Sequence, residues 1–223
     1  MNDQRQLIIW LMAGCVIMML ARIAYSSEDS RRYTFLETTG SDELSHSWYI
    51  QPAGNYIETR WISPDRAFSN RSDETGNTMQ WRISSDNADI TAWRVGNSIR
   101  FDGKRDDADI SQSVEIDDSP WFQSLSYALG EFSQSRQDSV EFWFVRPDNL
   151  DVVKMRATRV GNEEVITDKG IFHARKVRIS VSGFLSPFWK AFYWFRDSDG
   201  LFVRYHGVNG PPGTPSTTIL LDG

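Results

Sequence analysis

The chain has 223 residues, of which 40% are hydrophobic and 24% are charged, a balance that excludes a wholly disordered protein. Its formal net charge of −6 argues against the concentrated basic surface that nucleic-acid binding requires, so no nucleic-acid partner is expected. The length suits one β-rich domain behind a short targeting segment, and such a domain can fold without disulfides or a metal.

The first segment, residues 1–26, is predicted to direct the chain into or across a membrane. Leu7–Ala21 carries no charge and is flanked by arginines. Such a run is long for the apolar core of a signal peptide and short for a membrane span. If the segment is counted to Tyr25, it is long enough to span a membrane. We therefore expect a cleaved signal peptide or an uncleaved anchor that contacts the membrane through residues 7–25. Either one places the domain in the periplasm, soluble after cleavage or tethered to the inner membrane.

Cysteine usage limits the chemistry of the chain. The only cysteine, Cys15, lies inside the apolar run, where Met12–Cys15 is weakly similar to a lipoprotein signal. The apolar residues that continue after Cys15 argue against lipidation, which is kept as a minor alternative. The rest of the chain has no cysteine, so it forms no disulfide, redox motif or thiolate metal site.

Residues 27–47 are rich in Ser, Asp, Glu and Thr and show little hydrophobic periodicity. They are predicted to form a polar tether, in which Tyr33–Thr38 is a strand candidate. Residues 48–223 are predicted to form a single β-rich domain.

Within this domain the hydrophobic pattern mostly has a period of two, which is typical of β-strands. Turn signals at Gly96–Asn97, Gly161–Asn162 and Asp199–Gly200 separate some of the apolar runs. Strands are predicted over Tyr56–Trp61, Met79–Ile83, Ile90–Val95, Ser98–Asp102, Ser111–Ile116, Val140–Val145, Val153–Val160, Glu164–Thr167, Phe172–Val181, Phe188–Arg196, Leu201–His206 and Thr217–Leu221.

One segment changes to a helical period. Ser119 and Pro120 are suited to the N-cap and the first position of a helix. The apolar residues that then recur at spacings of three and four are Trp121, Phe122, Leu125, Ala128, Leu129 and Phe132. This spacing predicts an amphipathic helix of about four turns, although Gly130 is unfavourable within it.

The expected fold class is mainly β, a curved antiparallel sheet or half-open barrel of about ten strands with one amphipathic helix. No β–α–β unit is found, which argues against a parallel sheet. The helix is expected to cover the open, concave side of the sheet.

Several stretches between Thr91 and Leu221 resemble a group of uncharacterised bacterial periplasmic domains of unknown function. They include AWRVGNSIRFDG, PWFQSLSYAL, EFWFVRP, GNEEVITDKGIFHARKVRIS and FWKAFYWFRDSDGLFVRYHGVNGPPGTP. The resemblance implies a periplasmic location and a curved sheet with one helix, distantly like the half-barrels of lipoprotein carriers. It implies no active site.

The most aromatic strand, Phe188–Arg196, is apolar on both faces, so both faces must be covered. One alternative is a dry core on both sides. The other is that one face lines a cavity for an acyl chain or a similar apolar ligand. The candidate ligand-binding residues under this second hypothesis are Trp121, Phe122, Leu125, Trp143, Phe192, Trp194 and Tyr205.

No catalytic or metal-binding motif is found, so we predict no enzyme activity, no cofactor and no metal. The histidines His46, His173 and His206 lie on different elements without ligand spacing. Asp197–Gly200 matches only the start of a Ca²⁺ loop and is better interpreted as a hairpin turn.

Two functions are therefore considered. The first is an exported envelope protein that binds a lipid or another apolar small molecule between the sheet and the helix. The alternative is a membrane-tethered interaction or scaffold protein with an envelope protein partner and neither ligand nor catalysis. Under this alternative, Gly207–Pro215 would be a loop that docks onto the partner. The same segment is also explained as a plain connection between the last two strands.

Overall fold

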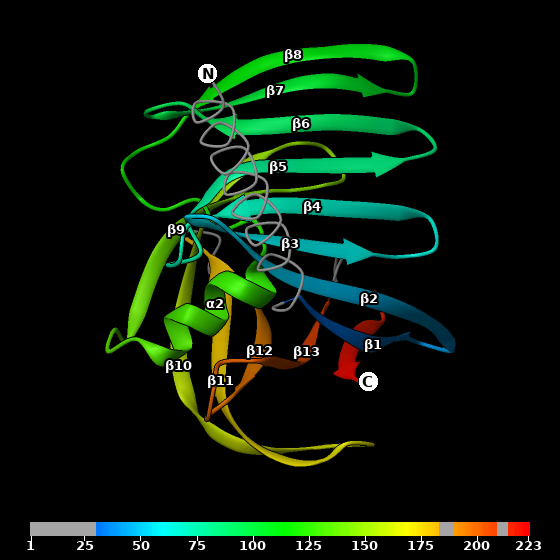
Figure 1. Cartoon of the computed structure of the whole chain (residues 1–223), viewed down its shortest axis with the longest axis vertical. Coiled ribbons are helices and arrows are strands. Elements are labelled where there is room, and N and C mark those ends of the chain that lie inside the picture. Colours follow the sequence, from blue (N-terminus) through cyan, green and yellow to red (C-terminus); the bar gives the residue numbers. More distant parts are fainter. Residues whose placement is uncertain (1–29, 183–189, 209–213) are drawn as a thin grey trace, which may run out of the picture.

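The computed structural model describes residues 30–182, 190–208 and 214–223. Within these ranges the chain forms one antiparallel sheet of fourteen strands and one α-helix, α2 (Figure 1). The predicted fold class, a curved antiparallel sheet with one helix, is confirmed. The predicted targeting segment, residues 1–26, lies outside the described residues.

The strands are longer and more numerous than the sequence pattern predicts. They are β1 (Arg31–Thr39), β2 (Asp42–Ala53), β3 (Tyr56–Ile62), β4 (Arg66–Ser72), β5 (Thr78–Ser85), β6 (Ala88–Arg94), β7 (Ser98–Arg105), β8 (Ala108–Glu115), β9 (Ser139–Val145), β10 (Val152–Thr167), β11 (Gly170–Val181), β12 (Lys190–Arg196), β13 (Phe202–Val208) and β14 (Ser216–Leu221).

The strand order is β8-β7-β6-β5-β4-β3-β2-β1-β14-β13-β12-β11-β10-β9. The first eight strands are successive antiparallel neighbours that lead outward from β1. The chain then crosses to the opposite edge, and the last six strands return from β9 to β14. Strand β14 pairs with β1, with Phe35 opposite Leu221. The first and last strands in this order, β8 and β9, are therefore joined by the crossing segment that contains α2.

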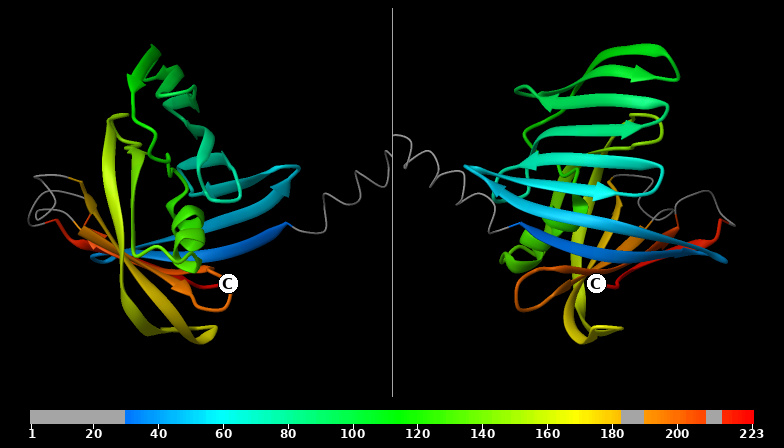
Figure 2. Two further views of the ribbon diagram at one scale, coloured as in Figure 1. Left: turned by 90° about the vertical axis from the view of Figure 1, so that its left-hand side faces the viewer. Right: turned by 45° about the vertical axis from the view of Figure 1, so that its right-hand side comes forward.

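The sheet is strongly curved, and Figure 2 shows its two ends rising on either side of the crossing segment. Buried apolar side chains form two clusters. The larger one surrounds α2 and includes Phe35, Leu129 and Phe195. The smaller one lies among β5–β8 and is completed by Trp121 and other residues from the crossing segment and β9. The crossing segment thus joins both ends of the sheet.

The predicted polar tether at residues 27–47 is wrong from residue 31 onward, because β1 and the first half of β2 lie in the middle of the sheet. The strand candidate Tyr33–Thr38 lies within β1 and is confirmed, whereas β2 and β4 were not predicted. Buried polar side chains conceal both strands from a hydrophobicity pattern: His46 is buried in β2, and Asn70 and Ser72 are buried in β4.

The turn predicted at Gly161–Asn162 is also wrong. Strand β10 runs through this position, and its pairing with β11 shifts between Arg159 and Gly161. Such a bulge needs a residue with unusual backbone angles, which Gly161 supplies with a φ of 140°. The two predicted strands Val153–Val160 and Glu164–Thr167 are therefore parts of one strand, β10.

The helix begins later than predicted: α2 spans Leu125–Gln134, and in the segment before it Trp121 forms an isolated parallel β-bridge with Trp143. Pro120 O accepts a hydrogen bond from Trp143 N, and Trp143 O accepts one from Phe122 N, so this segment lies alongside β9. Adjacent residues of an extended segment point to opposite sides. Trp121 therefore enters the smaller cluster and Phe122 the larger one, which a helix would not allow.

Helix α2 lies against the sheet at a distance that only glycine permits. A Cβ atom at Gly130 would lie 2.5 Å from the carbonyl oxygen of Gly200, in the turn between β12 and β13. On another side of the helix, a Cβ atom at Gly76 would lie 2.5 Å from the Cα atom of Ala128. Gly130 is thus explained by close packing and not by helix propensity.

Candidate functional site

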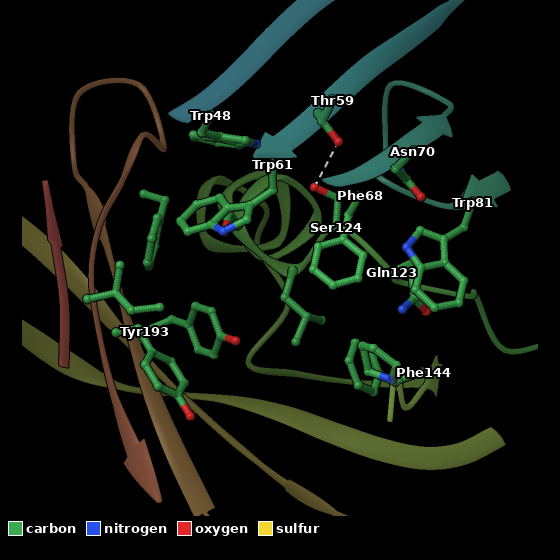
Figure 3. Close-up of a pocket in the computed structure, with 16 residues that line it drawn as sticks. Trp48, Thr59, Trp61, Phe68, Asn70, Trp81, Gln123, Ser124, Phe144 and Tyr193 are labelled. Atoms are coloured by element: carbon green, nitrogen blue, oxygen red, sulfur yellow. Dashed lines mark hydrogen bonds between the residues drawn. The ribbon is translucent and has the colours of Figure 1, made fainter. Parts of the chain in front are cut away.

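A pocket of about 260 Å³, half open to solvent, lies on the concave side between the two halves of the sheet (Figure 3). Strands β2–β5 form one wall, β9 and β12–β14 contribute to the opposite one, and the start of α2 lies between them. The lining residues are Trp48, Thr59, Trp61, Phe68, Asn70, Trp81, Gln123, Ser124, Leu125, Ser126, Phe144, Pro147, Tyr193, Phe202, Tyr205 and Ile219.

Eight of the sixteen lining residues are aromatic, and several of their rings pack against one another. Phe68 stacks on Trp81 with ring centroids 6.2 Å apart and an interplanar angle of 12°. At the other end, Phe202 contacts both Trp48 and Tyr193. Packed rings have few alternative rotamers, so the walls are formed before any ligand arrives.

The polar side chains of the pocket are mostly engaged with one another or with the backbone. Thr59 Oγ1 donates to Ser124 Oγ at 3.0 Å, so the residue that precedes α2 uses its hydroxyl across the pocket and not as a helix cap. Gln123 Oε1 accepts from Trp121 Nε1 and from Val145 N, and its Nε2 donates to Val145 O. These bonds hold the crossing segment against β9.

Asn70 is different, because one of its polar atoms has no partner. Its residue is only 5% exposed, and its Nδ2 donates weakly to Ser72 Oγ at 3.3 Å. Its Oδ1 is buried and accepts no hydrogen bond from any described residue. A buried amide oxygen without a partner costs about 1–3 kcal/mol relative to a bonded one.

Of the residues predicted to bind a ligand, Leu125 and Tyr205 line the pocket. Trp121 and Phe122 are buried in the two apolar clusters. Trp143 is half-buried, and its Nε1 donates to Asp117 at 2.8 Å.

The remaining two predicted residues, Phe192 and Trp194, are separated from the pocket by the pleat of β12. Tyr193, between them in sequence, is the residue of this strand that lines the pocket. The Nζ atom of Lys176 lies 4.7 Å from the Phe192 ring centroid and 4.9 Å from that of Trp194. Both rings therefore belong to the opposite face of the strand.

A short network fixes that opposite face. Glu163 accepts hydrogen bonds from Lys176 Nζ at 2.7 Å and from Trp194 Nε1 at 2.9 Å. These two donors lower the pKa of Glu163 below its ordinary value. The face is thus a packed cation–π and ion-pair surface.

The site residues that sequence reasoning missed are chiefly Trp48, Trp61 and Trp81. They lie on three different strands, β2, β3 and β5, and nothing in the sequence indicates that these strands face the β12–β14 region. Aromatic residues at alternate strand positions are a signal that these three tryptophans share with many core residues, so this signal does not separate the pocket from the core.

Beside the pocket, three side chains form a line in the order carboxylate, imidazole, hydroxyl. His46 Nε2 lies 2.8 Å from Glu37 Oε2, and His46 Nδ1 lies 2.8 Å from Ser63 Oγ. In serine hydrolases the hydroxyl contacts Nε2 and the acid contacts Nδ1, so the imidazole is reversed here. His46 is 4% exposed and packs on Trp61 at 5.2 Å, which supports a structural role behind the pocket wall.

Among the described residues, no group of three or more His, Cys, Asp or Glu side chains could hold a metal ion. No helix within the ranges that the structure describes is both long enough and apolar enough to cross a membrane.

Comparison with known proteins supports the fold. A β-barrel-like protein of the domain of unknown function DUF1849 from Brucella abortus matches 85% of this chain and 94% of its own, with a TM-score of 0.62 and 10% identity. At that identity the match shows fold alone, and it confirms the predicted resemblance in fold to an uncharacterised bacterial domain.

Two further structures are more distant. They are a proposed lipoprotein from Parabacteroides distasonis and a proposed exported protein with a YmcC-like fold from Bacteroides fragilis, each covering 88% of this chain and 95% of its own at 10% identity. Their TM-scores, 0.36 and 0.35, are too low to support an argument. No family model and no curated protein matches the chain.

Proposed function

We propose that the protein is an exported cell-envelope protein that binds an apolar or lipid-like ligand in the concave pocket. The observation that carries the proposal is the aromatic pocket of about 260 Å³ between the two halves of the sheet. Concave, mostly apolar sites with a few polar groups are the usual form of small-molecule sites. The uncharged segment Leu7–Ala21 supports export.

The size of the pocket limits the ligand. A dry apolar cavity of about 150 Å³ is enough to hold benzene, whereas pockets for drug-sized ligands measure about 300–1,000 Å³. A volume of about 260 Å³ therefore suits one acyl chain of moderate length or a small ring system. A lipid with two long chains would have to leave part of its apolar surface outside.

Binding can be tested with 10-bromodecan-1-ol, because bromine quenches indole fluorescence on contact. Trp48, Trp61 and Trp81 line the pocket, so saturable quenching is expected as the purified protein is titrated. Leu125→Trp enlarges a side chain that lines the pocket and should weaken binding at least about tenfold by filling the space.

Leu44→Trp is the matched control, because Leu44 is 39% exposed on β2 and does not line the pocket. It should bind the probe as the unmodified protein does. Absence of saturable quenching in the unmodified protein, or equal binding by both variants, would contradict the proposal.

A membrane-held interaction protein is the second candidate, and one observation favours it. Ile166 and Ile171 face each other near the turn between β10 and β11, and they are 74% and 62% exposed. Exposed apolar groups of this kind often mark contacts with other molecules. A photoreactive residue at Ile166 should then capture the same envelope protein repeatedly in cells, and failure to capture any would count against this candidate.

A further inference from the structure

The pocket has a polar end, and its chemistry indicates the class of ligand. Asn70 Oδ1 has no described hydrogen-bond partner, and Figure 3 shows it at the same end of the pocket as the indole nitrogen of Trp81. An amide oxygen only accepts hydrogen bonds and an indole N–H only donates them. A ligand group that both donates and accepts would complement this end.

The other polar groups nearby are already satisfied. Thr59 bonds to Ser124, and Gln123 makes three hydrogen bonds within the crossing segment and β9. Among these polar groups, Asn70 is the one whose burial leaves a hydrogen bond unmade. A donor on the ligand would supply that hydrogen bond on binding.

The pocket also lacks charge. None of the sixteen described residues that line it is Asp, Glu, Lys, Arg or His. An ionised carboxylate or phosphate would lose its hydration there without gaining a cation, which is strongly unfavourable. The smaller adjoining pocket, which shares Trp48 and Ser126, contains Glu131 and Asp199 beside a single arginine, so it does not favour an anion either.

From these observations we propose that the pocket selects a single-chain amphiphile with an uncharged head group, an amide or an alcohol, whose donor bonds to Asn70. This inference rests on the proposed function, since it assumes that an apolar chain occupies the pocket. The chain would lie along the aromatic wall that ends at Phe202 and Tyr193, and the head would be buried beside β4 and β5.

The test compares three ligands that share one chain: decanamide, N,N-dimethyldecanamide and decanoate. Each is titrated at pH 8, where decanoate is ionised, by displacement of 10-bromodecan-1-ol. Decanamide should bind about tenfold more tightly than its dimethyl form, which has no N–H donor, and more tightly still than decanoate.

Asn70→Leu should abolish the preference for decanamide over the dimethyl form, and a far-ultraviolet circular dichroism spectrum equal to that of the unmodified protein shows that this variant is folded. Asn87→Leu, the same change on an exposed turn residue, should keep the preference. Equal affinities of all three ligands, a preference for decanoate, or a preference unchanged by Asn70→Leu would overturn the inference while leaving the proposed function intact. Failure of every ligand and of the bromo probe to bind would overturn the proposed function itself.

Discussion

Replacing Gly130 by alanine tests how tightly α2 is seated, because helix propensity and packing predict opposite results. Inside a helix, Gly→Ala normally stabilises by about 1 kcal/mol. Here the new Cβ would lie 2.5 Å from Gly200 O, and real Cβ atoms essentially never come within 3.0 Å of another heavy atom. The helix or the turn must therefore move by at least half an ångström.

The turn is poorly able to move. Gly200 N donates to Arg196 O at 2.8 Å, and Arg196 is paired with Asp199 within the same turn. Overpacking of this kind costs about 1–3 kcal/mol. We therefore expect Gly130→Ala to lower the free energy of unfolding by about 1–2 kcal/mol, even after the gain in propensity. For a domain of this size each kcal/mol lowers Tm by about 2–4 °C.

Urea unfolding followed by far-ultraviolet circular dichroism measures the effect. Glu131→Ala, a change at the next residue of the helix, is the control and should cause no loss of stability. If Gly130→Ala were as stable as the unmodified protein or more stable, the close approach of the helix to Gly200 would be refuted.

Three further predictions concern the surroundings of the pocket. His46→Ala should lower the free energy of unfolding by about 2–3 kcal/mol in urea titrations, because it removes a buried ring with partners on both nitrogens. Burial and the nearby Glu74 raise the pKa of Glu131 above its ordinary value. The protonated Glu131 side chain therefore favours the folded state below the ordinary glutamate pKa, and this contribution is lost as the pH rises through the folded-state pKa. Glu131→Gln should therefore raise Tm at pH 7, and the difference should vanish on acidification below the ordinary pKa. Arg105 donates two bonds of 2.8 Å to carbonyls of the β9–β10 loop, so Arg105→Ala should speed amide hydrogen exchange in β7 and β8.

The sequence pattern predicts the strands well where apolar and polar residues alternate, as in β6, β7 and β11. It fails where the concave face carries polar residues, because buried Asn70 or His46 makes a strand look like a loop. It also fails at Trp121 and Phe122, since two adjacent aromatic residues fit a helix face as well as an extended segment buried on both sides. Only tertiary contacts separate these two structures.

The candidate site was harder to predict than the fold. The aromatic strand β12 does contribute to the pocket, but its lining residue is Tyr193. The predicted ligand-binding residues Phe192 and Trp194 lie on the other face of the strand. With both faces aromatic, alternation alone does not identify the concave one. The wall formed by β2–β5 depends on the pairing of β1 with β14, a contact between the two ends of the domain that local sequence does not encode.

The position of the pocket follows from how the curved sheet is filled. A twisted sheet of fourteen strands curls, and its interior is too wide for side chains from the strands alone to fill. Helix α2 fills the half formed by β11–β13, and Trp121 fills the half formed by β5–β8. The pocket is the space between these two fillings, bordered by Gln123–Ser126, where the crossing segment passes from one to the other. An apolar chain bound in the pocket would therefore contact both halves of the sheet. Above its Kd, such a ligand would raise the free energy of unfolding in proportion to the logarithm of the ligand concentration.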